Sequence, residues 1–339
     1  MQRFLCVLMG VLGWSAFALG LVSPVEAAGP VKLSYSNFFP PTHIQSLLAE
    51  EWCREVEKRS DGAVVIDYYP AGTLTKAQDI YDGVVQRISD IGLSALGYTK
   101  GRFPILSGVD LPMGYTSGVQ ATALANAVYA KFSPQEFADT KVLYFHAHGP
   151  GILHTAGKAV TSLDDLKGMK IRATGNSASV IKALGGNPVA MSMPDSYQSI
   201  QKGVVNGGIY PVETNKGWKM GEVVKYMTDT TAVAYTTTFF VVMNKNVWDG
   251  LSPEIQQVIV DVSQEWIPRH GQAWDESDAE GREFFLAQPD RKIVTLEPEE
   301  AQAWTQAMEP IFTEYEAECT KAGVDGQAVL EFMRETLAN

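Results

Sequence analysis

The segment that decides the fold runs from Thr161 to Glu213 and reads TSLDDLKGMKIRATGNSASVIKALGGNPVAMSMPDSYQSIQKGVVNGGIYPVE. Ser162 with Asp165 three residues later is the pattern of a capping box, which predicts one short helical turn. Residues 170–172 then alternate as a strand does, with Arg172 on the opposite face from the isoleucine before it. The segment therefore begins with a capped turn followed by a strand.

A helix follows this strand directly, because the small polar residues 173–177 precede an apolar face that Gly185 and Gly186 end. A guanidinium at Arg172 would then lie beside the unpaired N–H groups of the helix N-terminus, and together they form a site for an anion. We expect a carboxylate there. The alternative is that Arg172 forms a salt bridge at the surface or between lobes, which contributes little when exposed.

The rest of the segment predicts a second capped helix. Ser192 and Asp195 have capping-box spacing, and Pro194 falls in the first turn, where its missing N–H has no cost. Tyr197 lies on one side of this helix, and a short strand then leads toward Glu213.

The order of these motifs resembles the substrate-binding proteins of tripartite ATP-independent periplasmic (TRAP) transporters, of the DctP type. The resemblance rests on SLDDLKGMKIR, ALGGNPVAM, the proline-led helix with Tyr197, and QKGVVNGG. Residues 71–75 with 81–85, and residues 89–92 with 101–104, also fit the family. The resemblance covers almost the whole chain beyond residue 27.

The resemblance implies a two-lobed α/β fold of the type II periplasmic-binding-protein kind, in which each lobe is a sheet flanked by helices. It implies that lobe I takes residues 28–149 plus 236–275, and that lobe II takes 150–235 plus 276–339. It further implies that Arg172 binds the carboxylate of a small organic acid in the cleft, and that the protein delivers this acid to the TRAP membrane permease.

Strands and helices alternate from residue 31 to residue 94, which predicts a parallel, doubly wound first lobe. In such a sheet the ligand lies beyond the carboxyl ends of the strands, here at the loops 37–43 and 94–98. We expect the chain to cross between lobes near residues 149–151 and again within residues 230–244, which a hinged binding protein needs. Ser252 starts a long helix that Pro268 should bend.

Residues 1–27 have the pattern of a secretory signal, with Arg3, an apolar run and a small-residue cleavage site at 25–27. An uncleaved membrane anchor is the alternative. The formal net charge is −12, and loss of Arg3 and Glu26 leaves it unchanged. This charge argues against nucleic acid as a partner. We therefore expect a periplasmic protein, and we expect it to be a monomer.

Cysteine, histidine and catalytic motifs carry little signal. Cys53 and Cys319 are open to two interpretations, a disulfide formed in an oxidising compartment or two separate buried thiols. His146, His148 and His154 allow a metal site, but the spacing that would make it strong is absent. No nucleophile elbow, zinc-protease motif or dinucleotide-binding motif occurs. We therefore expect no cofactor, no metal and no catalysis.

The expected ligand is an apolar, aromatic monocarboxylate. Members of the resembled family that bind acids with further charged groups often carry a second arginine about twenty residues before the first, and Ile152 stands there instead. Tyr210 stands where such members often have asparagine, and it offers a flat apolar face. Glu213 could accept from an amino or indole N–H of the ligand. The alternatives are a C4-dicarboxylate or another 2-oxo or hydroxy acid, a bilobal periplasmic enzyme, and the receptor of an ATP-driven importer.

The predicted ligand-binding residues are Arg172, Tyr210, Glu213, Asn37, Phe39, His154, Tyr98, Asn176, Met193 and Phe239. The aromatic residues near the predicted cleft loops are Phe38, Phe39, Tyr98, Phe145, Tyr210, Trp218, Phe239 and Phe240. We expect about half of these rings to belong to the core instead.

Overall fold

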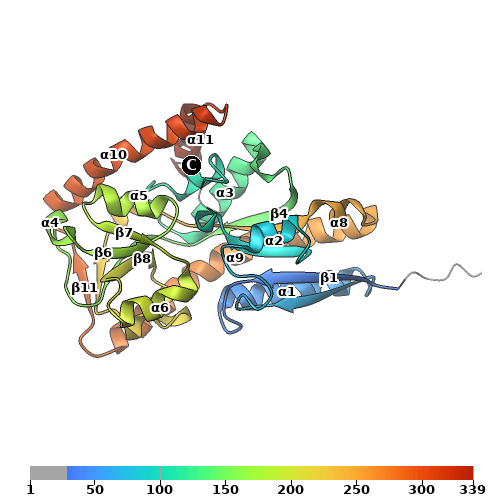
Figure 1. The fold of residues 1–339 in the computed structure, drawn as a ribbon, viewed down its shortest axis with the longest axis horizontal. Coiled ribbons are helices and arrows are strands. Elements are labelled where there is room, and N and C mark those ends of the chain that lie inside the picture. The colour runs from blue at the N-terminus through green and yellow to red at the C-terminus, as the bar shows by residue number, and fades with distance from the viewer. Residues whose placement is uncertain (1–28, 100, 339) are drawn as a thin grey trace, which may run out of the picture.

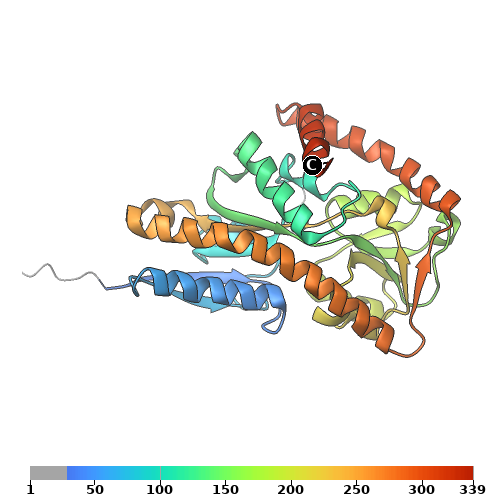
Figure 2. The ribbon, with the colours of Figure 1, turned by 180° about the vertical axis from the view of Figure 1, so that it is seen from behind.

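The computed structural model describes residues 29–99 and 101–338, so the predicted signal sequence lies outside the described residues. Two sheets, each flanked by helices, lie side by side along the long axis of the molecule (Figure 1). Helix α9 (Pro253–Ala287) runs along both of them (Figure 2). The expected two-lobed α/β architecture is confirmed.

The first sheet has five strands in the order β2-β1-β3-β10-β4. Its strands are β1 (Val31–Asn37), β2 (Val64–Tyr69), β3 (Ile91–Ala95), β4 (Thr140–Ala147) and β10 (Thr238–Asn244). Strand β10 is antiparallel to both of its neighbours. The predicted parallel arrangement of the strands within residues 31–94 is confirmed, and the complete sheet is mixed because β10 enters from the second lobe and starts at the cleft end, where β3 and β4 finish.

Besides α9, the helices that cover this sheet are α1 (Ile44–Arg59), α2 (Ile80–Val85), α3 (Gly118–Phe132) and α8 (Lys245–Asp249). Apolar residues at four-residue spacing turn one face of α1 inward, so Trp52 and Val56 are fully buried. The short 3-10 turns η1 (Leu96–Tyr98), η2 (Leu106–Asp110) and η3 (Gln135–Phe137) connect the elements. The parallel strands β1 and β3 end together and hold the loops that follow them at the cleft edge.

The second sheet has six strands in the order β11-β9-β5-β8-β6-β7. Its strands are β5 (Gly151–Thr155), β6 (Lys170–Ala173), β7 (Asn187–Ala190), β8 (Gly207–Pro211), β9 (Tyr226–Asp229) and β11 (Lys292–Thr295). The remaining elements around it are α4 (Leu163–Leu166), α5 (Asn176–Ala183), α6 (Met193–Gln201), α7 (Thr214–Gly217), η4 (Met220–Glu222) and η5 (Thr231–Val233). Strands β6 and β8 are parallel and both finish at the cleft.

The first predicted capping box is confirmed at the start of α4. The Ser162 side chain accepts from the backbone of Asp165, and the Asp165 carboxylate accepts from Ser162 N–H at 3.2 Å. The second is wrong, because the Ser192 hydroxyl donates to the Asp195 carboxylate at 2.7 Å and caps no backbone N–H. Pro194 does lie in the first turn of α6, as predicted.

Replacing Ser162 with alanine should lower the free energy of unfolding by about 1 kcal/mol, the usual cost of losing an N-cap side chain. Urea unfolding of Ser162→Ala measures this loss. Ser179→Ala is the matched control, since Ser179 lies inside α5 and its hydroxyl forms no hydrogen bond with the described residues. Equal stability of Ser162→Ala and the parent would show that the cap contributes nothing.

The two predicted crossings lie side by side between the lobes. Gly151 N–H donates to the Tyr235 carbonyl at 2.8 Å, so the outgoing and returning segments form a β-bridge. Helix α9 is a third connection, and it continues without a break through Pro268. The last helices are α10 (Pro298–Lys321) and α11 (Gly326–Ala338), and α11 packs on α3 of the first lobe. The residue boundaries of the lobes stay predictions.

Two carboxylates of α9, one helical turn apart, hold different lobes. Asp275 accepts from the N–H groups of Gly118 and Val119 at the start of α3, at 2.5 and 3.2 Å. Asp278 accepts from the N–H of Glu213 in the second lobe at 2.7 Å. Helix α9 therefore passes from one lobe to the other between these two residues.

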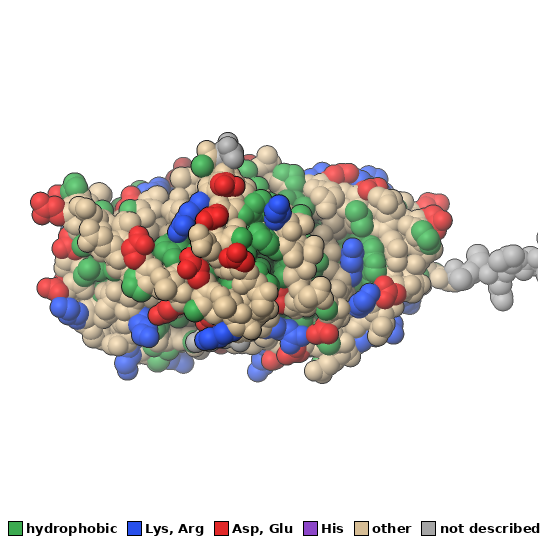
Figure 3. Space-filling model, turned by 90° about the horizontal axis from the view of Figure 1, so that it is seen from above, with side chains coloured by type: hydrophobic (Ala, Val, Ile, Leu, Met, Phe, Trp, Pro, Cys, Tyr) green, Lys and Arg blue, Asp and Glu red, His purple; other side chains and the backbone are tan. Residues whose placement is uncertain are grey.

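The surface carries charges of both signs. Figure 3 shows acidic and basic side chains interspersed over one face, without a continuous basic patch on that face. Within residues 29–99 and 101–338, no helix is long and apolar enough to cross a membrane. Cys53 and Cys319 are both free and buried. Of the two interpretations of these cysteines, separate buried thiols is therefore correct.

Candidate functional site

A cavity lies between the lobes, where β1 and β3 end on one side and β6 and β8 end on the other. The space between its atoms, counting the open mouth, is about 370 Å³. The residues that line it are Phe38, Phe39, Tyr98, His148, Arg172, Thr174, Met193, Tyr210, Pro211, Glu213, Thr214, Trp218, Tyr235, Thr237, Phe239 and Trp274. The cavity suits a compact ligand.

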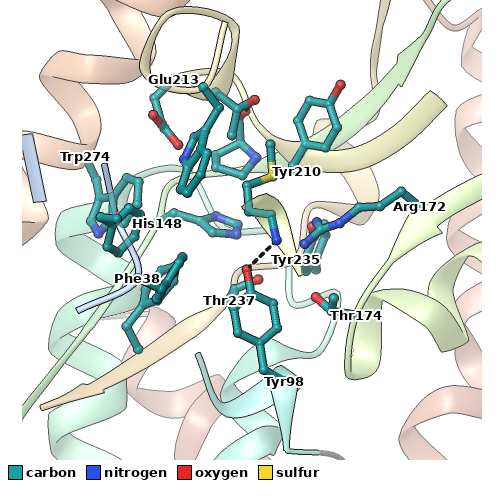
Figure 4. A pocket seen from close by; sticks show the side chains of 16 residues that line it. Phe38, Tyr98, His148, Arg172, Thr174, Tyr210, Glu213, Tyr235, Thr237 and Trp274 are labelled. Carbon is teal, nitrogen blue, oxygen red and sulfur yellow. Dashed lines mark hydrogen bonds between the residues drawn. The ribbon is translucent and has the colours of Figure 1, made fainter. Parts of the chain in front are cut away.

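Arg172 forms one end of this cavity (Figure 4). Strand β6 carries the side chain inward, and only 4% of the residue is exposed. Its Nε donates to the Met191 carbonyl at 3.1 Å, and one Nη donates to the Ile209 carbonyl at 3.5 Å. A guanidinium has five N–H donors, and the Tyr98 hydroxyl also interacts with it, but these contacts do not use all five.

No carboxylate of the described residues pairs with Arg172, so the salt-bridge alternative is not realised. A buried charge without a counter-ion costs several kcal/mol unless a partner arrives. The two carbonyl contacts fix the plane of the guanidinium and leave its other donors toward the cavity. This end of the cavity is therefore built to receive an anionic group.

The opposite end of the cavity is aromatic (Figure 4). Phe38 and Phe39 stack with ring centres 4.2 Å apart, and Phe239 stacks on Trp274 at 5.4 Å. Trp218 closes the wall, with its ring centre 6.1 Å from that of Phe38. Ring faces at these distances offer a flat planar group stacking and edge contacts. An apolar, planar group fits this end better than a charged one.

Contacts between the lobes close the cavity on both sides. His43 Nδ1 accepts from Gln45 N–H, so Nε2 carries the proton and donates to Glu213 Oε2 at 3.0 Å. The Met193 N–H donates to the Tyr98 hydroxyl at 3.0 Å. These bonds join elements of different lobes, so the structure is the closed form of a cleft.

The comparisons with known proteins give the family. The family model of bacterial extracellular solute-binding proteins, family 7 (DctP), matches residues 35–318. The chain belongs to this family. The family 7 protein is thus an extracytoplasmic solute receptor of the TRAP transporter type, and the resemblance seen in the sequence is confirmed.

Individual relatives are distant in sequence but close in fold. The 2,3-diketo-L-gulonate-binding periplasmic protein YiaO of Escherichia coli is 26% identical over 259 residues, which are 75% of this chain and 76% of that protein. The TRAP solute-binding protein of Bordetella bronchiseptica, solved with (R)- and (S)-mandelate, is 27% identical, with a TM-score of 0.85 and coverage of 91% and 99%. The protein of Rhodoferax ferrireducens, solved with copurified benzoate, is 28% identical, with a TM-score of 0.85 and coverage of 91% and 98%.

The structure of the family 7 protein brings most of the predicted ligand residues together. Seven of the ten line the cavity: Arg172, Tyr210, Glu213, Phe39, Tyr98, Met193 and Phe239. The Tyr210 ring stacks on His154 at 4.3 Å, and its buried hydroxyl has no partner among the described residues. Burial raises the pKa of Tyr210 far above its usual value, so the hydroxyl stays a neutral donor.

The other three predicted residues do not line the cavity, and neighbouring groups of the receptor engage their polar atoms. Asn37 donates to the Tyr68 hydroxyl at 2.8 Å and accepts from Phe39 N–H, which shapes the loop. His154 lies behind Tyr210 and contacts Asn215 at 3.3 Å. Asn176 donates across the lobes to the Ser107 carbonyl at 2.6 Å.

Glu213 has a different partner from the one expected. It lines the cavity and is 2% exposed, but its Oε2 is bonded to His43. Lys216, three residues along the chain from Glu213, pairs with Glu280. Glu213 therefore joins the lobes across the closed cleft. Its Oε2 is used by His43 and is not available to a ligand N–H, contrary to our expectation.

Sequence reasoning missed other parts of the wall. Trp274 lies inside α9, where residue spacing does not distinguish a core position from a cavity wall. Tyr235 and Thr237 belong to the returning crossing, which no motif marks. Of the eight aromatic candidates, Phe145 and Phe240 are core residues and the other six line the cavity, more than the half we expected.

The histidines separate in the structure. His146 stacks on His270 with ring centres 4.3 Å apart and accepts from the Trp274 indole N–H at 3.0 Å. His148 lines the cavity instead, and His154 lies in the second lobe. In the described part of the receptor, no group of three or more His, Cys, Asp or Glu side chains could hold a metal ion.

Proposed function

We propose that this TRAP receptor captures an aromatic monocarboxylate in the periplasm and delivers it unchanged to a membrane permease. The observation that carries the proposal is Arg172, a buried guanidinium without a counter-ion at the end of a cavity whose far wall is aromatic. A carboxylate on Arg172 supplies the missing charge. The ring of the ligand then lies between the aromatic side chains.

The charges of the wall support a single acidic group on the ligand. Of the described residues that line the cavity, Arg172 alone is a lysine or arginine. Ile152, at the place of a second family arginine, is buried and packs in the second lobe. A second carboxylate would therefore enter an apolar region without a partner, which costs several kcal/mol.

Two of the solved relatives hold ligands of this class. Two structures at 27% and 28% identity hold mandelate and benzoate, which combine one carboxylate with one phenyl ring. At these identities the ligand of a relative supports a ligand class for this protein and does not assign its ligand. The wall of this cavity adds an independent argument, because its rings belong to this chain.

The test is a thermal-shift and calorimetric screen of protein unfolded and refolded to remove bound compounds. Benzoate, phenylacetate and indole-3-acetate should stabilise the protein, by about 2.7 kcal/mol at a concentration one hundred times Kd. Succinate and glucuronate should not. Stabilisation by succinate or glucuronate alone would contradict the proposed ligand class.

Recovered ligand decides between binding and catalysis. Mass spectrometry of the compound released after overnight incubation should return the added acid at its original mass, because a receptor releases the compound that it binds unchanged. A new product would place this protein among enzymes. Scattering from the same samples should show one protomer per particle, as expected for a monomer.

A further inference from the structure

His148 occupies the middle of the cavity wall, between the Arg172 end and the aromatic end (Figure 4). It follows β4 at the outgoing crossing and is 2% exposed. Its Nδ1 lies 2.5 Å from the Gly149 carbonyl oxygen. A carbonyl oxygen only accepts hydrogen bonds, so Nδ1 carries the proton.

The other ring nitrogen of His148 is therefore an acceptor. Burial, together with the positive charge of Arg172 and against the hydrogen bond to Gly149, lowers the pKa of His148 to about 4, so the ring is neutral near pH 7. A neutral imidazole with its proton on Nδ1 has a lone pair on Nε2. Within the described residues, Nε2 forms no hydrogen bond.

Two donors that lie against His148 are engaged elsewhere. The Tyr235 ring meets His148 edge-on at 5.6 Å, but its hydroxyl donates to the Ile209 carbonyl at 2.9 Å. The Trp274 indole N–H donates to His146. In the closed structure no described residue donates to Nε2, which leaves this acceptor open to the ligand.

We infer that His148 Nε2 accepts a hydrogen bond from a hydroxyl group of the ligand, so that His148 selects hydroxylated aromatic acids. This inference rests on the proposed function and names a narrower class within it. A hydroxyl fits better than an ammonium, because Arg172 repels a second positive charge. A methoxy group or a second carboxylate would place an acceptor against the lone pair.

The expected selectivity follows from the cost of an unpaired acceptor. A ligand without a donor leaves buried Nε2 unsatisfied, whereas a hydroxyl restores the bond that water makes in the open cleft. A site that binds a substrate hydroxyl rejects analogues that lack it strongly. We expect the best hydroxylated acid to bind at least about tenfold tighter than its parent.

Calorimetry on matched ligand sets tests this inference. One set is benzoate with its hydroxy and methoxy derivatives at each ring position, and the other is phenylacetate with mandelate. In the parent protein, at least one hydroxylated acid should bind more tightly than both its parent acid and its methoxy analogue. In His148→Phe the ratio of the affinity for the hydroxylated acid to that for its parent acid should fall to about one. His148→Gln, whose amide oxygen accepts a hydrogen bond, should restore part of this ratio.

Each outcome has one meaning. Equal binding of hydroxylated and parent acids to the unmodified protein overturns the role of His148, as does a preference that persists in His148→Phe. No binding of any aromatic acid by the unmodified protein contradicts the proposed function instead. If His148→Phe does not fold, 15N NMR of the unmodified protein decides. The His148 Nε2 resonance should shift from its free-acceptor position with the preferred hydroxylated acid but not with the parent acid, and an unchanged resonance would overturn the inference.

Discussion

Replacing Arg172 with alanine should weaken binding of aromatic monocarboxylates by about 2–5 kcal/mol, the range found when one partner of a buried charge pair is removed. The loss follows because the ligand carboxylate would enter a closed cavity without a counter-charge. Calorimetry with benzoate or its best-binding derivative measures it. Wild-type affinity in this variant would show that the carboxylate binds elsewhere.

Replacing Arg172 should have the opposite effect on the stability of the protein without ligand. In the free state Arg172 is a buried charge without a partner, so Arg172→Met should leave the melting temperature unchanged or raise it. Arg291→Ala is the matched control, because Arg291 also binds backbone carbonyls of the second lobe but lies outside the cavity wall. It should keep ligand affinity. A collapse of stability in Arg172→Met would indicate a structural role.

Placing valine at Gly97 should hold the cleft open. Gly97 and Gly175 belong to different lobes, and a Cβ at Gly97 would lie 3.3 Å from the Gly175 Cα. The further methyl groups of valine would need the two backbones to separate, at a cost of about 1–3 kcal/mol as in overpacked cores. Ligand affinity should fall by roughly 5- to 150-fold.

Small-angle scattering separates this effect from a local one. The unmodified protein should show a smaller radius of gyration with ligand, while Gly97→Val should keep the larger value at the same ligand concentration. Gly157→Val is the control, since a Cβ at Gly157 would meet no other atom within 4 Å. Full closure of Gly97→Val with unchanged affinity would show that the two glycines need not approach.

The sequence predicted the chemistry of the Arg172 end because that end depends on local order. A strand, an arginine and a helix start follow one another within residues 170–177, so neighbours in sequence are neighbours in space. The capping box at Ser162 was predictable for the same reason. The capping box predicted at Ser192 is absent although the spacing fits, because the Ser192 hydroxyl donates to the Asp195 carboxylate instead.

The aromatic end was predictable only in part, because distant segments assemble it. Phe38 and Phe39 follow a strand and could be placed at a cleft loop. Trp274 lies within a helix whose inward face looks the same whether it meets a core or a cavity. The tautomer of His148 depends on one carbonyl contact, which residue spacing does not reveal.

The two carboxylates of α9 limit how the lobes can move. Asp275 holds the start of α3, and Asp278, three residues later on an unbroken helix, holds the backbone of Glu213. Because one turn of this helix is hydrogen-bonded to both lobes, the lobes can neither slide past each other nor move far apart at this point. Rotation about that turn is the degree of freedom that remains. Opening should therefore be a pivot with its axis near residues 275–278, and the mouth of the cavity, not its base, should travel farthest.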